Sequence, residues 1–215
     1  MILYWALLLI IAMLSYGIGS ISTTVLASNY VFRTRLSRLG RGNVWFSNFR
    51  RVYGLKGFLK LLIVELVKDV IPILLGGLIL NFKGHADVGF IFAGVCMLLG
   101  RLYPLFSDFH GCHATVAMAL VAGFAAPSAG IAAAVVGLLV TVILRYLSLG
   151  AVTAALTAAA VALLTVDDVL IRNLIFVCAG LELFRHIPSL FRILAKREER
   201  LSYEEDLSYK LDEDF

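Results

Sequence analysis

The sequence has few charged residues. Only 16% of its 215 residues are charged and 60% are apolar, and its mean hydropathy is +0.91. A soluble domain carries roughly a quarter charged residues and about half apolar ones. The apolar excess therefore excludes a soluble domain and predicts an integral membrane protein.

Cysteine is also scarce, and Gly and Pro are present in ordinary amounts, which excludes collagen-like and disordered classes. Cys96, Cys112 and Cys178 are odd in number and lack metal-ligand spacing, so packing is their simplest role rather than a disulfide scaffold. Lys and Arg are absent before the apolar stretch 2–27, whereas a cleaved signal peptide begins with a charged region. We therefore expect this stretch to stay in the mature chain.

Long apolar stretches define the predicted architecture, because a membrane-spanning helix needs about 20 predominantly apolar residues. The candidate stretches are residues 2–27, 57–80, 88–106, 114–126, 129–144, 149–166 and 169–185. The fourth is short, ends at Pro127, and could tilt or stop partway through the bilayer. We expect an all-α, polytopic membrane protein with about seven transmembrane helices.

Acidic residues are missing from residues 33–60, although this stretch contains eight basic ones. Cytoplasmic loops of membrane proteins are enriched in Lys and Arg. With seven spans, residues 33–56, Arg145 and the basic residues between 185 and 200 fall on one side of the membrane. We therefore expect the N-terminus outside and the C-terminus in the cytoplasm.

The end of the chain reverses this charge balance, since residues 196–215 contain eight acidic and four basic side chains. A segment with low hydrophobicity and high charge does not bury enough apolar surface to fold alone. We expect a membrane domain over residues 1–195 and an acidic cytoplasmic tail over residues 196–215. The tail is expected to be disordered or to form a short helix that binds a partner.

The second apolar stretch carries a polar face. Glu65, Lys68, Asp69 and Pro72 recur at i, i+3, i+4 and i+7, which places them on one side of a helix. Ionisable groups at membrane depth are costly and normally face a protein interior or an aqueous cavity. The face is therefore an ion-paired structural element, an interfacial start of the helix, or the lining of a cavity.

The segment that follows the first apolar stretch has a composition suited to anions. Gly40-Arg41-Gly42-Asn43 is followed by Ser47-Asn48 and Arg50-Arg51. Glycine lets backbone N–H groups approach a phosphate closely, and Asn and Arg add further donors. The same composition also suits contact with anionic lipid headgroups. Both interpretations stay open on this segment alone.

Two histidines beside a cysteine, His110 and His113 around Cys112, suggest a zinc site. Such a site needs a third and a fourth ligand, and the remaining histidines are His85, predicted on the opposite side, and His186. We therefore expect no metal and no cofactor. The histidines are expected to supply N–H donors around an anion.

The last apolar stretch ends in polar residues. Arg185, Ser189 and Arg192 share a helical face, with His186 beside it. Pro188 is expected to break the helix near this point. These residues form a polar site or serve as a positively charged membrane anchor.

The order and spacing of these segments resemble the PlsY family, bacterial membrane enzymes that transfer an acyl group from acyl phosphate to glycerol 3-phosphate. The resemblance extends over about residues 14–198 of the chain. The matching positions are Gly19-Ser20-Ile21; Gly40 to Asn48 with Arg51; Glu65, Lys68 and Pro72; Gly100, Pro104, Phe109 and Gly111; Arg145-Tyr146-Leu147-Ser148-Leu149; and Arg185, His186, Arg192, Leu194 and Glu198.

The resemblance implies a seven-span enzyme of the bacterial plasma (inner) membrane, with its active site facing the cytoplasm. Its substrates would be acyl phosphate and glycerol 3-phosphate, and its product 1-acylglycerol 3-phosphate (lysophosphatidate). The expected binding partners are these substrates and the lipid bilayer. Nucleic acid is not expected to bind, and the resemblance specifies no protein partner. By the resemblance, His186 is catalytic and orients the acceptor hydroxyl or takes its proton. The implied substrate-binding residues are Arg41, Gly42, Asn43, Asn48, Arg51, Lys68, Gly111, His113, Ser148 and Ser189.

Several positions depart from the family pattern. Arg41 stands where the family has Ser, Trp45 where it has Gly, Arg101 where it has His, His113 where it has Lys, and Ser189 where it has Asn. A change from Lys to His keeps a donor without a fixed charge. Two alternatives therefore stay open. One is a catalytically degenerate relative that binds lipid or a partner protein, and the other is an acyltransferase with a different phosphorylated acceptor.

Overall fold

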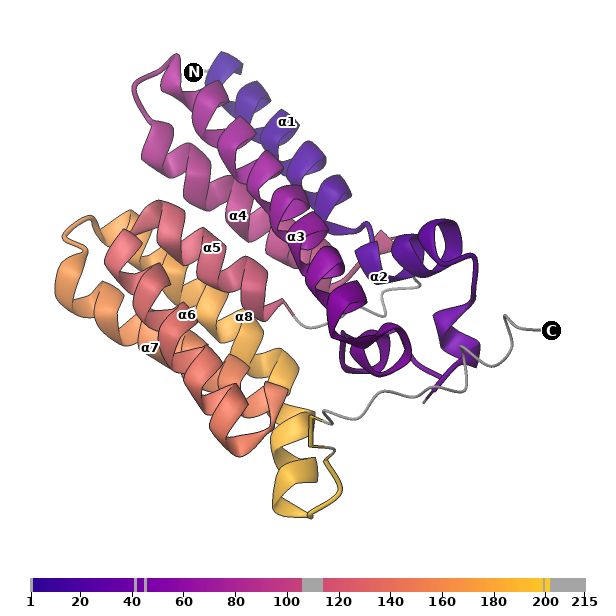
Figure 1. The fold of residues 1–215 in the computed structure, drawn as a ribbon. Helices are drawn as coiled ribbons and strands as arrows, with labels where there is room; N and C mark the ends of the chain where they lie inside the picture. Colours follow the sequence, from indigo (N-terminus) through magenta and orange to yellow (C-terminus); the bar gives the residue numbers. More distant parts are fainter. Residues whose placement is uncertain (1, 41, 45, 106–113, 199, 202–215) are drawn as a thin grey trace. The chain divides into compact units, whose positions relative to one another are not determined.

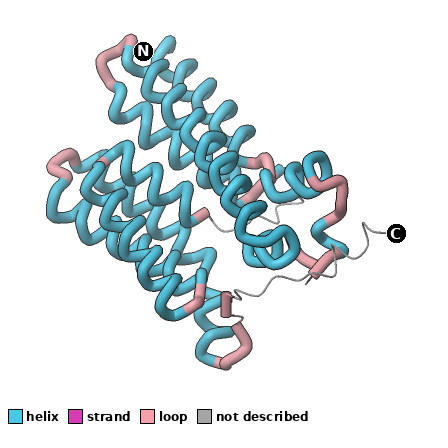
Figure 2. The backbone as a smooth tube through the Cα atoms, viewed as in Figure 1, coloured by secondary structure: helices cyan, strands magenta, loops and turns pink. Residues whose placement is uncertain are grey.

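Figure 1 shows the computed structural model of the chain, which describes residues 2–40, 42–44, 46–105, 114–198 and 200–201. Over these residues the regular secondary structure is helical, and Figure 2 shows no strand among them. The all-α prediction is thereby confirmed. In chain order the elements are α1 (Ile2–Gly19), α2 (Thr23–Leu26), the π-helix η1 (Ala27–Val31), the 3-10 helix η2 (Leu36–Arg38), α3 (Phe46–Asn81), α4 (Ala86–Leu102), α5 (Thr115–Ala125), α6 (Pro127–Leu144), α7 (Leu147–Thr165) and α8 (Val169–Leu194).

Each predicted apolar stretch overlaps one of the helices α1 and α3 to α8. The fourth stretch is short, as expected: α5 has 11 residues, which at 1.5 Å per residue is about half of the roughly 30 Å hydrocarbon core. Pro127 begins α6 at a position where its missing N–H costs no helical hydrogen bond.

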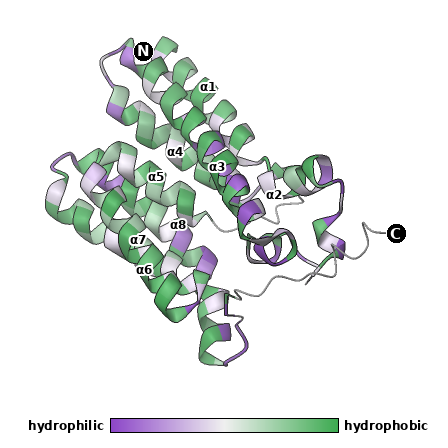
Figure 3. Ribbon diagram, viewed as in Figure 1, coloured by the Kyte–Doolittle hydropathy of each residue, from purple (hydrophilic) through white to green (hydrophobic). Residues whose placement is uncertain are grey.

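Within the described part of the chain, four helices are long and apolar enough to cross a membrane. They are α1, α6, α7 and α8. Hydrophobic residues cover most of the length of these helices in Figure 3. The chain therefore has the composition of an integral membrane protein.

The chain divides into two compact units. The first unit consists of residues 1–21 and 68–200, and the second of residues 22–67 and 201–215. The boundary falls inside α3, between Val67 and Lys68. The first unit contains most of the apolar helices, and the second contains the basic stretch that precedes residue 61.

Small residues bring the helices of the first unit close together. A methyl group on Gly130 of α6 would collide with the backbone of Gly123 of α5, and one on Gly137 would meet Ala154 of α7. Along α7, Ala151, Ala154, Ala155, Ala158 and Ala162 are all buried. Close backbone approach through Gly and Ala is the usual way of packing membrane helices, and α5, α6 and α7 pack in this way.

The polar face of α3 is a buried face. Glu65, Asp69 and Pro72 are buried and Lys68 is half-buried. In the first unit the guanidinium of Arg101 on α4 donates to Asp69 over 2.7 Å, and the two side chains are 2% and 0% exposed. Lys68 Nζ donates to the backbone carbonyl of Ile21 over 3.0 Å. Of the alternatives left by the sequence, the ion-paired structural face is the one observed at Asp69.

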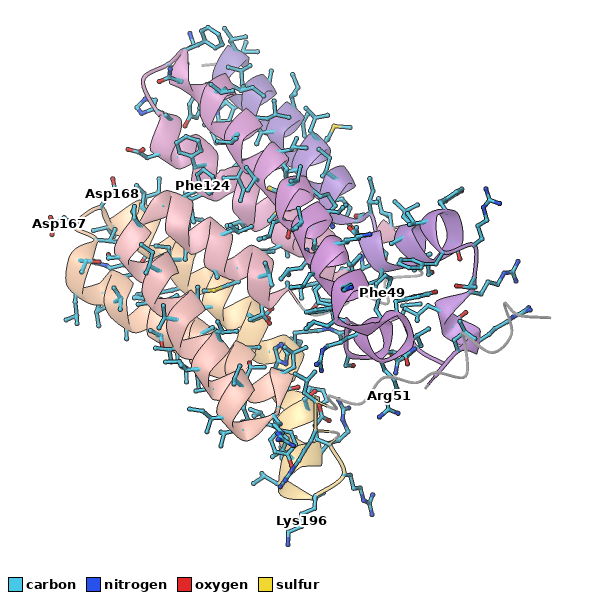
Figure 4. The ribbon with its side chains drawn as sticks, in the orientation of Figure 1. Phe49, Arg51, Phe124, Asp167, Asp168 and Lys196 are labelled. Atoms are coloured by element: carbon cyan, nitrogen blue, oxygen red, sulfur yellow. The ribbon has the colours of Figure 1, made fainter. Side chains whose placement is uncertain are left out.

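The second unit is built around aromatic packing at the start of α3. Leu36, Phe49, Val52, Tyr53 and Leu61 form its apolar core, and the label of Phe49 marks this core in Figure 4. The Tyr53 ring stacks on Phe32 at 4.0 Å between centroids. Burial raises the pKa of the Tyr53 phenol, an effect that its hydrogen bond with Thr34 partly offsets.

Helix α3 begins at Phe46, earlier than the predicted start at residue 57. Gly54 has φ +69° and ψ −177°, so the first turns form a separate helical piece joined to the rest at a kink. A left-handed φ is readily adopted by glycine and strained for other residues. Asn48 and Arg51 therefore lie on a helix, not in an open loop.

Helix α8 continues through Pro188, so the expected break at this proline is wrong. The helix extends from Val169 to Leu194. It is capped at its start by Asp168, which accepts from the Ile171 N–H over 3.0 Å and is labelled in Figure 4. Pro188 removes one backbone hydrogen bond but lies on the exposed side of the helix, so the buried face that includes His186 and Ser189 is uninterrupted.

Candidate active site

In the second unit, Asn48 organises the segment before α3. Its side-chain amide donates to the carbonyl oxygens of Asn43, Leu39 and Leu36 over 2.7, 3.1 and 3.4 Å. The residue is 1% exposed. Gly40 has φ +56°, and a methyl group there would collide with the Asn48 side chain. Asn48 thus fixes the curvature of the chain that carries the predicted phosphate-binding groups.

The basic side chains of this segment surround an open groove. The groove has a volume of about 550 Å³ and is lined by Thr34, Arg35, Arg38 and Leu39. Arg35 and Arg38 are exposed. Arginine forms forked, charge-assisted hydrogen bonds with phosphate and carboxylate, so this surface suits an anion.

Other predicted binding residues of the second unit lie near the start of α3. Gly42 is exposed and has φ +69°, and Asn43 is half-buried. Arg51 is half-buried on the first part of α3, where Figure 4 shows its side chain extending from the helix. Gly42 and Arg51 are thus at least partly exposed within this unit.

In the first unit, His186 lies in the centre of a buried polar cluster. Its Nε2 is 3.1 Å from Oε1 of Glu182, one helical turn earlier on α8. The side chains of His186 and Glu182 are 0% and 1% exposed. The hydroxyl of Thr115, at the start of α5, donates to the same carboxylate oxygen over 2.8 Å. The predicted catalytic histidine is therefore held by groups from two helices.

A second polar cluster links the start of α7 to the end of α8. Glu198 accepts from the Ser148 hydroxyl over 3.1 Å and from Arg192 Nε over 2.6 Å. Arg192 also donates to the Ser189 hydroxyl over 2.7 Å. The structure therefore brings together Ser148 and Ser189, two of the predicted substrate-binding residues, through one arginine and one carboxylate.

Three of the predicted binding residues, Arg41, Gly111 and His113, lie outside the described residues. Lys68 belongs to the polar face of α3, where its ammonium group is 3.6 Å from an Asp69 oxygen. Among the residues that the structure describes, no three His, Cys, Asp or Glu side chains are grouped as metal ligands would be.

Sequence reasoning missed two residues of these clusters, Glu182 and Thr115, and the pairing of Asp69 with Arg101. Glu182 was recognisable, because it precedes His186 by four residues and so shares its helical face. Thr115 and the pairing of Asp69 with Arg101 carried no such signal, because the partners are 67 and 32 residues apart in the chain.

A family comparison matches most of the chain. Residues 9–196 match the family model described as glycerol-3-phosphate acyltransferase. Among curated relatives, the glycerol-3-phosphate acyltransferase of Thermoanaerobacter pseudethanolicus is 26% identical over 196 residues, covering 91% of this chain and 96% of the relative. The enzyme of the same description from Listeria welshimeri is 29% identical over 198 residues, with 91% and 98% covered.

Comparison with solved structures indicates the same family. The chain is similar to the crystal structure of PlsY, an integral membrane glycerol 3-phosphate acyltransferase, in its glycerol 3-phosphate form. The TM-score is 0.77 and the identity 25%, with 91% of this chain and 96% of the other covered. The lysophosphatidic acid form of that protein matches with the same TM-score and coverage.

Proposed function

Because this chain belongs to the glycerol-3-phosphate acyltransferase family, we propose that it transfers a fatty acyl group from acyl phosphate to glycerol 3-phosphate. The product is 1-acylglycerol 3-phosphate, an early intermediate of phospholipid biosynthesis. The observation that carries the proposal is the family match over residues 9–196, which includes the buried His186.

The reaction needs a base and anion-binding groups but no covalent enzyme intermediate. The acceptor hydroxyl attacks the acyl carbonyl carbon, a new ester C–O bond forms, and the bond to the phosphate oxygen breaks with its electron pair leaving on phosphate. The proton of the hydroxyl passes to His186. Acyl phosphate is already activated, so no Ser or Cys nucleophile is required.

Both substrates carry phosphate, so cationic and N–H donors stabilise binding and the departing phosphate. The residues proposed to hold phosphate or glycerol groups are Arg41, Gly42, Asn43, Asn48, Arg51, Lys68, Gly111, His113, Ser148 and Ser189. For Asn48 the hydrogen bonds to three carbonyl groups support a role through the shape of its segment. For Ser148 and Ser189 the contacts with Glu198 and Arg192 support a fixed orientation of both hydroxyls.

The proposed topology has seven spans, with the N-terminus outside and the C-terminus in the cytoplasm. It is supported by the basic segment 33–56, since Lys and Arg favour the cytoplasmic side. The protein is then a multi-pass protein of the bacterial inner membrane, with its active site on the cytoplasmic side. Residues 1–195 form the acyltransferase domain and residues 196–215 an acidic tail.

A membrane subunit without activity is the alternative, favoured by Arg101. This residue replaces a histidine of the family pattern and is held in a buried ion pair with Asp69. A guanidinium held in a buried ion pair stabilises the fold and does not take part in acyl transfer. An acyltransferase with another phosphorylated acceptor is a further alternative that the same assay distinguishes.

The test is an assay of purified protein in lipid nanodiscs with acyl phosphate and glycerol 3-phosphate. Release of phosphate and formation of lysophosphatidate are followed together, with a family member of known activity alongside. We expect both products in equal amounts, and phosphate release that depends on the acceptor. Absence of lysophosphatidate while the family member is active contradicts the proposal.

A further inference from the structure

Helix α8 carries a buried carboxylate that the proposed reaction does not use. Glu182 is 1% exposed and belongs to the apolar stretch predicted at residues 169–185. Burying an ionisable side chain in an apolar stretch costs free energy. Such side chains are normally paired with polar groups and are often functional. Glu182 therefore needs a role beyond packing.

Two contacts of Glu182 converge on one oxygen. Its Oε1 accepts from the Thr115 hydroxyl over 2.8 Å and lies 3.1 Å from His186 Nε2. Glu182 and His186 are four residues apart on the same face of α8, while Thr115 reaches this oxygen from α5. Thr115 of α5 thus holds the Glu182 carboxylate, and this carboxylate holds His186 one turn later on α8.

These contacts determine which nitrogen of His186 carries its proton. An ionised carboxylate only accepts hydrogen bonds, so the nitrogen facing it must donate. With Glu182 ionised, a neutral imidazole in this position carries its proton on Nε2 and its proton-accepting lone pair on Nδ1. A partner on one ring nitrogen is the general means by which proteins set the tautomer of a histidine.

We propose that Glu182 is a positioning residue that holds His186 with its proton on Nε2 and its accepting nitrogen, Nδ1, toward the acceptor hydroxyl. This inference rests on the proposed function. When the hydroxyl O–H bond breaks, its proton binds Nδ1, and the imidazolium that results is stabilised by the carboxylate on Nε2. The electron pair of the hydroxyl forms the new ester bond, and the acyl–phosphate bond breaks as phosphate leaves.

The spectroscopic test is the nitrogen NMR spectrum of protein labelled with ¹⁵N-histidine, in nanodiscs. The signals of His186 are assigned by their loss in His186→Gln. We expect the wild type to show a protonated Nε2 and an unprotonated Nδ1 when His186 is neutral. Glu182→Leu, which removes the acceptor without leaving a buried charge, is expected to give a mixture of both tautomers. A wild-type proton on Nδ1, or an unchanged spectrum in Glu182→Leu, overturns the proposal.

The kinetic test separates positioning from substrate binding. Glu182→Leu is expected to lower kcat by roughly ten- to hundred-fold, the range for partners that orient a functional histidine. The KM for glycerol 3-phosphate should stay within about threefold, because Glu182 does not touch substrate. Asp87→Asn, which removes an exposed carboxylate of α4, is the matched control and should leave both constants unchanged. A change in KM alone overturns the proposal.

Thr115 provides a second set of variants in case Glu182→Leu does not fold. Thr115→Val keeps the shape of the side chain but removes the donor to Glu182, and it should lower kcat several-fold. Thr115→Ser keeps the hydroxyl and should restore most of the activity. Equal activity of the two variants overturns the proposal. If the wild type makes no product, the proposed function fails, and the NMR spectra still decide whether Glu182 fixes the ring.

Discussion

The two units of the molecule hold their polar side chains in opposite ways. In the first unit, carboxylates hold buried cationic or imidazole groups: Asp69 holds Arg101, and Glu182 lies against His186. In the second unit, backbone carbonyls hold the buried Asn48, and residues 33–60 contain no acidic side chain. The first unit thus pairs buried charges with one another, whereas in the second unit Arg35 and Arg38 of the basic segment are exposed.

This difference has an energetic consequence that variants can test. A buried charge whose partner is removed is destabilising by several kcal/mol, since the remaining charge has lost both water and its counter-ion. An exposed arginine that loses its ligand returns to water at little cost. Substitutions in the first unit should therefore affect folding or chemistry, and substitutions of the exposed basic groups should affect binding.

The largest effect is expected at His186. His186→Gln keeps a polar side chain of similar size but removes the base, and general-base catalysis contributes roughly 10²–10⁴-fold to a rate. Lysophosphatidate formation in nanodiscs should fall by that factor, with the thermal unfolding midpoint little changed. Activity within tenfold of the wild type would mean that the base lies elsewhere.

Asp69 provides the next test. Asp69→Leu leaves the guanidinium of Arg101 buried without its carboxylate and should lower the free energy of unfolding by about 3–5 kcal/mol. The measurement is an SDS titration followed by circular dichroism. The double variant Asp69→Leu with Arg101→Met should recover most of the loss, because the guanidinium and its carboxylate are removed together. A single variant as stable as the wild type would contradict the comparison of the two units.

Asn48 makes the corresponding test in the second unit. Asn48→Leu removes the amide hydrogen bonds to the carbonyl groups of Leu39 and Asn43, each worth about 0.5–1.5 kcal/mol, while the Leu39 oxygen keeps the N–H of Gly42 as a donor. The same SDS titration should therefore show a smaller loss than for Asp69→Leu. Ser47→Ala, at the neighbouring half-buried position, is the control. A loss larger than that of Asp69→Leu would reverse the comparison.

Arg51 tests binding without folding. A hydrogen bond to a charged group contributes about 1.5–3 kcal/mol, so Arg51→Gln should raise the KM for at least one phosphorylated substrate by roughly tenfold or more. The free energy of unfolding should change by less than about 0.5 kcal/mol, as is usual for surface substitutions. Lys56→Gln, at an exposed cation five residues later on α3, should leave both KM values within twofold. An Arg51 variant with normal KM values would place the anion elsewhere.

The apolar stretches and the polar face of α3 could be predicted because they depend on local periodicity. For example, the stretch predicted at residues 129–144 corresponds to α6, which begins two residues earlier, at Pro127. The pairing of Asp69 with Arg101 could not be predicted, because it depends on how α3 and α4 pack and not on spacing along either helix. The break expected at Pro188 did not occur: this residue lies on the exposed side of α8, away from the buried face that includes His186 and Ser189. Asn48 was predicted by its residue type, but its carbonyl partners follow from a chain reversal at Gly40 that composition alone does not specify.

The smallest effect is expected at Cys112, and it separates direct transfer from a covalent enzyme intermediate. Thiol nucleophiles are the usual route to acyl-enzymes in sites that combine Cys with His, and Cys112 lies between His110 and His113 in the sequence. Because acyl phosphate is already activated, Cys112→Ser should keep kcat and KM within about twofold, and no acyl group should remain on wild-type protein after quenching with acid. Mass spectrometry of the quenched protein makes the measurement, with Cys96→Ser as the control for a thiol in the apolar helix α4. An acyl adduct on Cys112 would show that this histidine-rich segment, and not His186 with Glu182, carries the first chemical step.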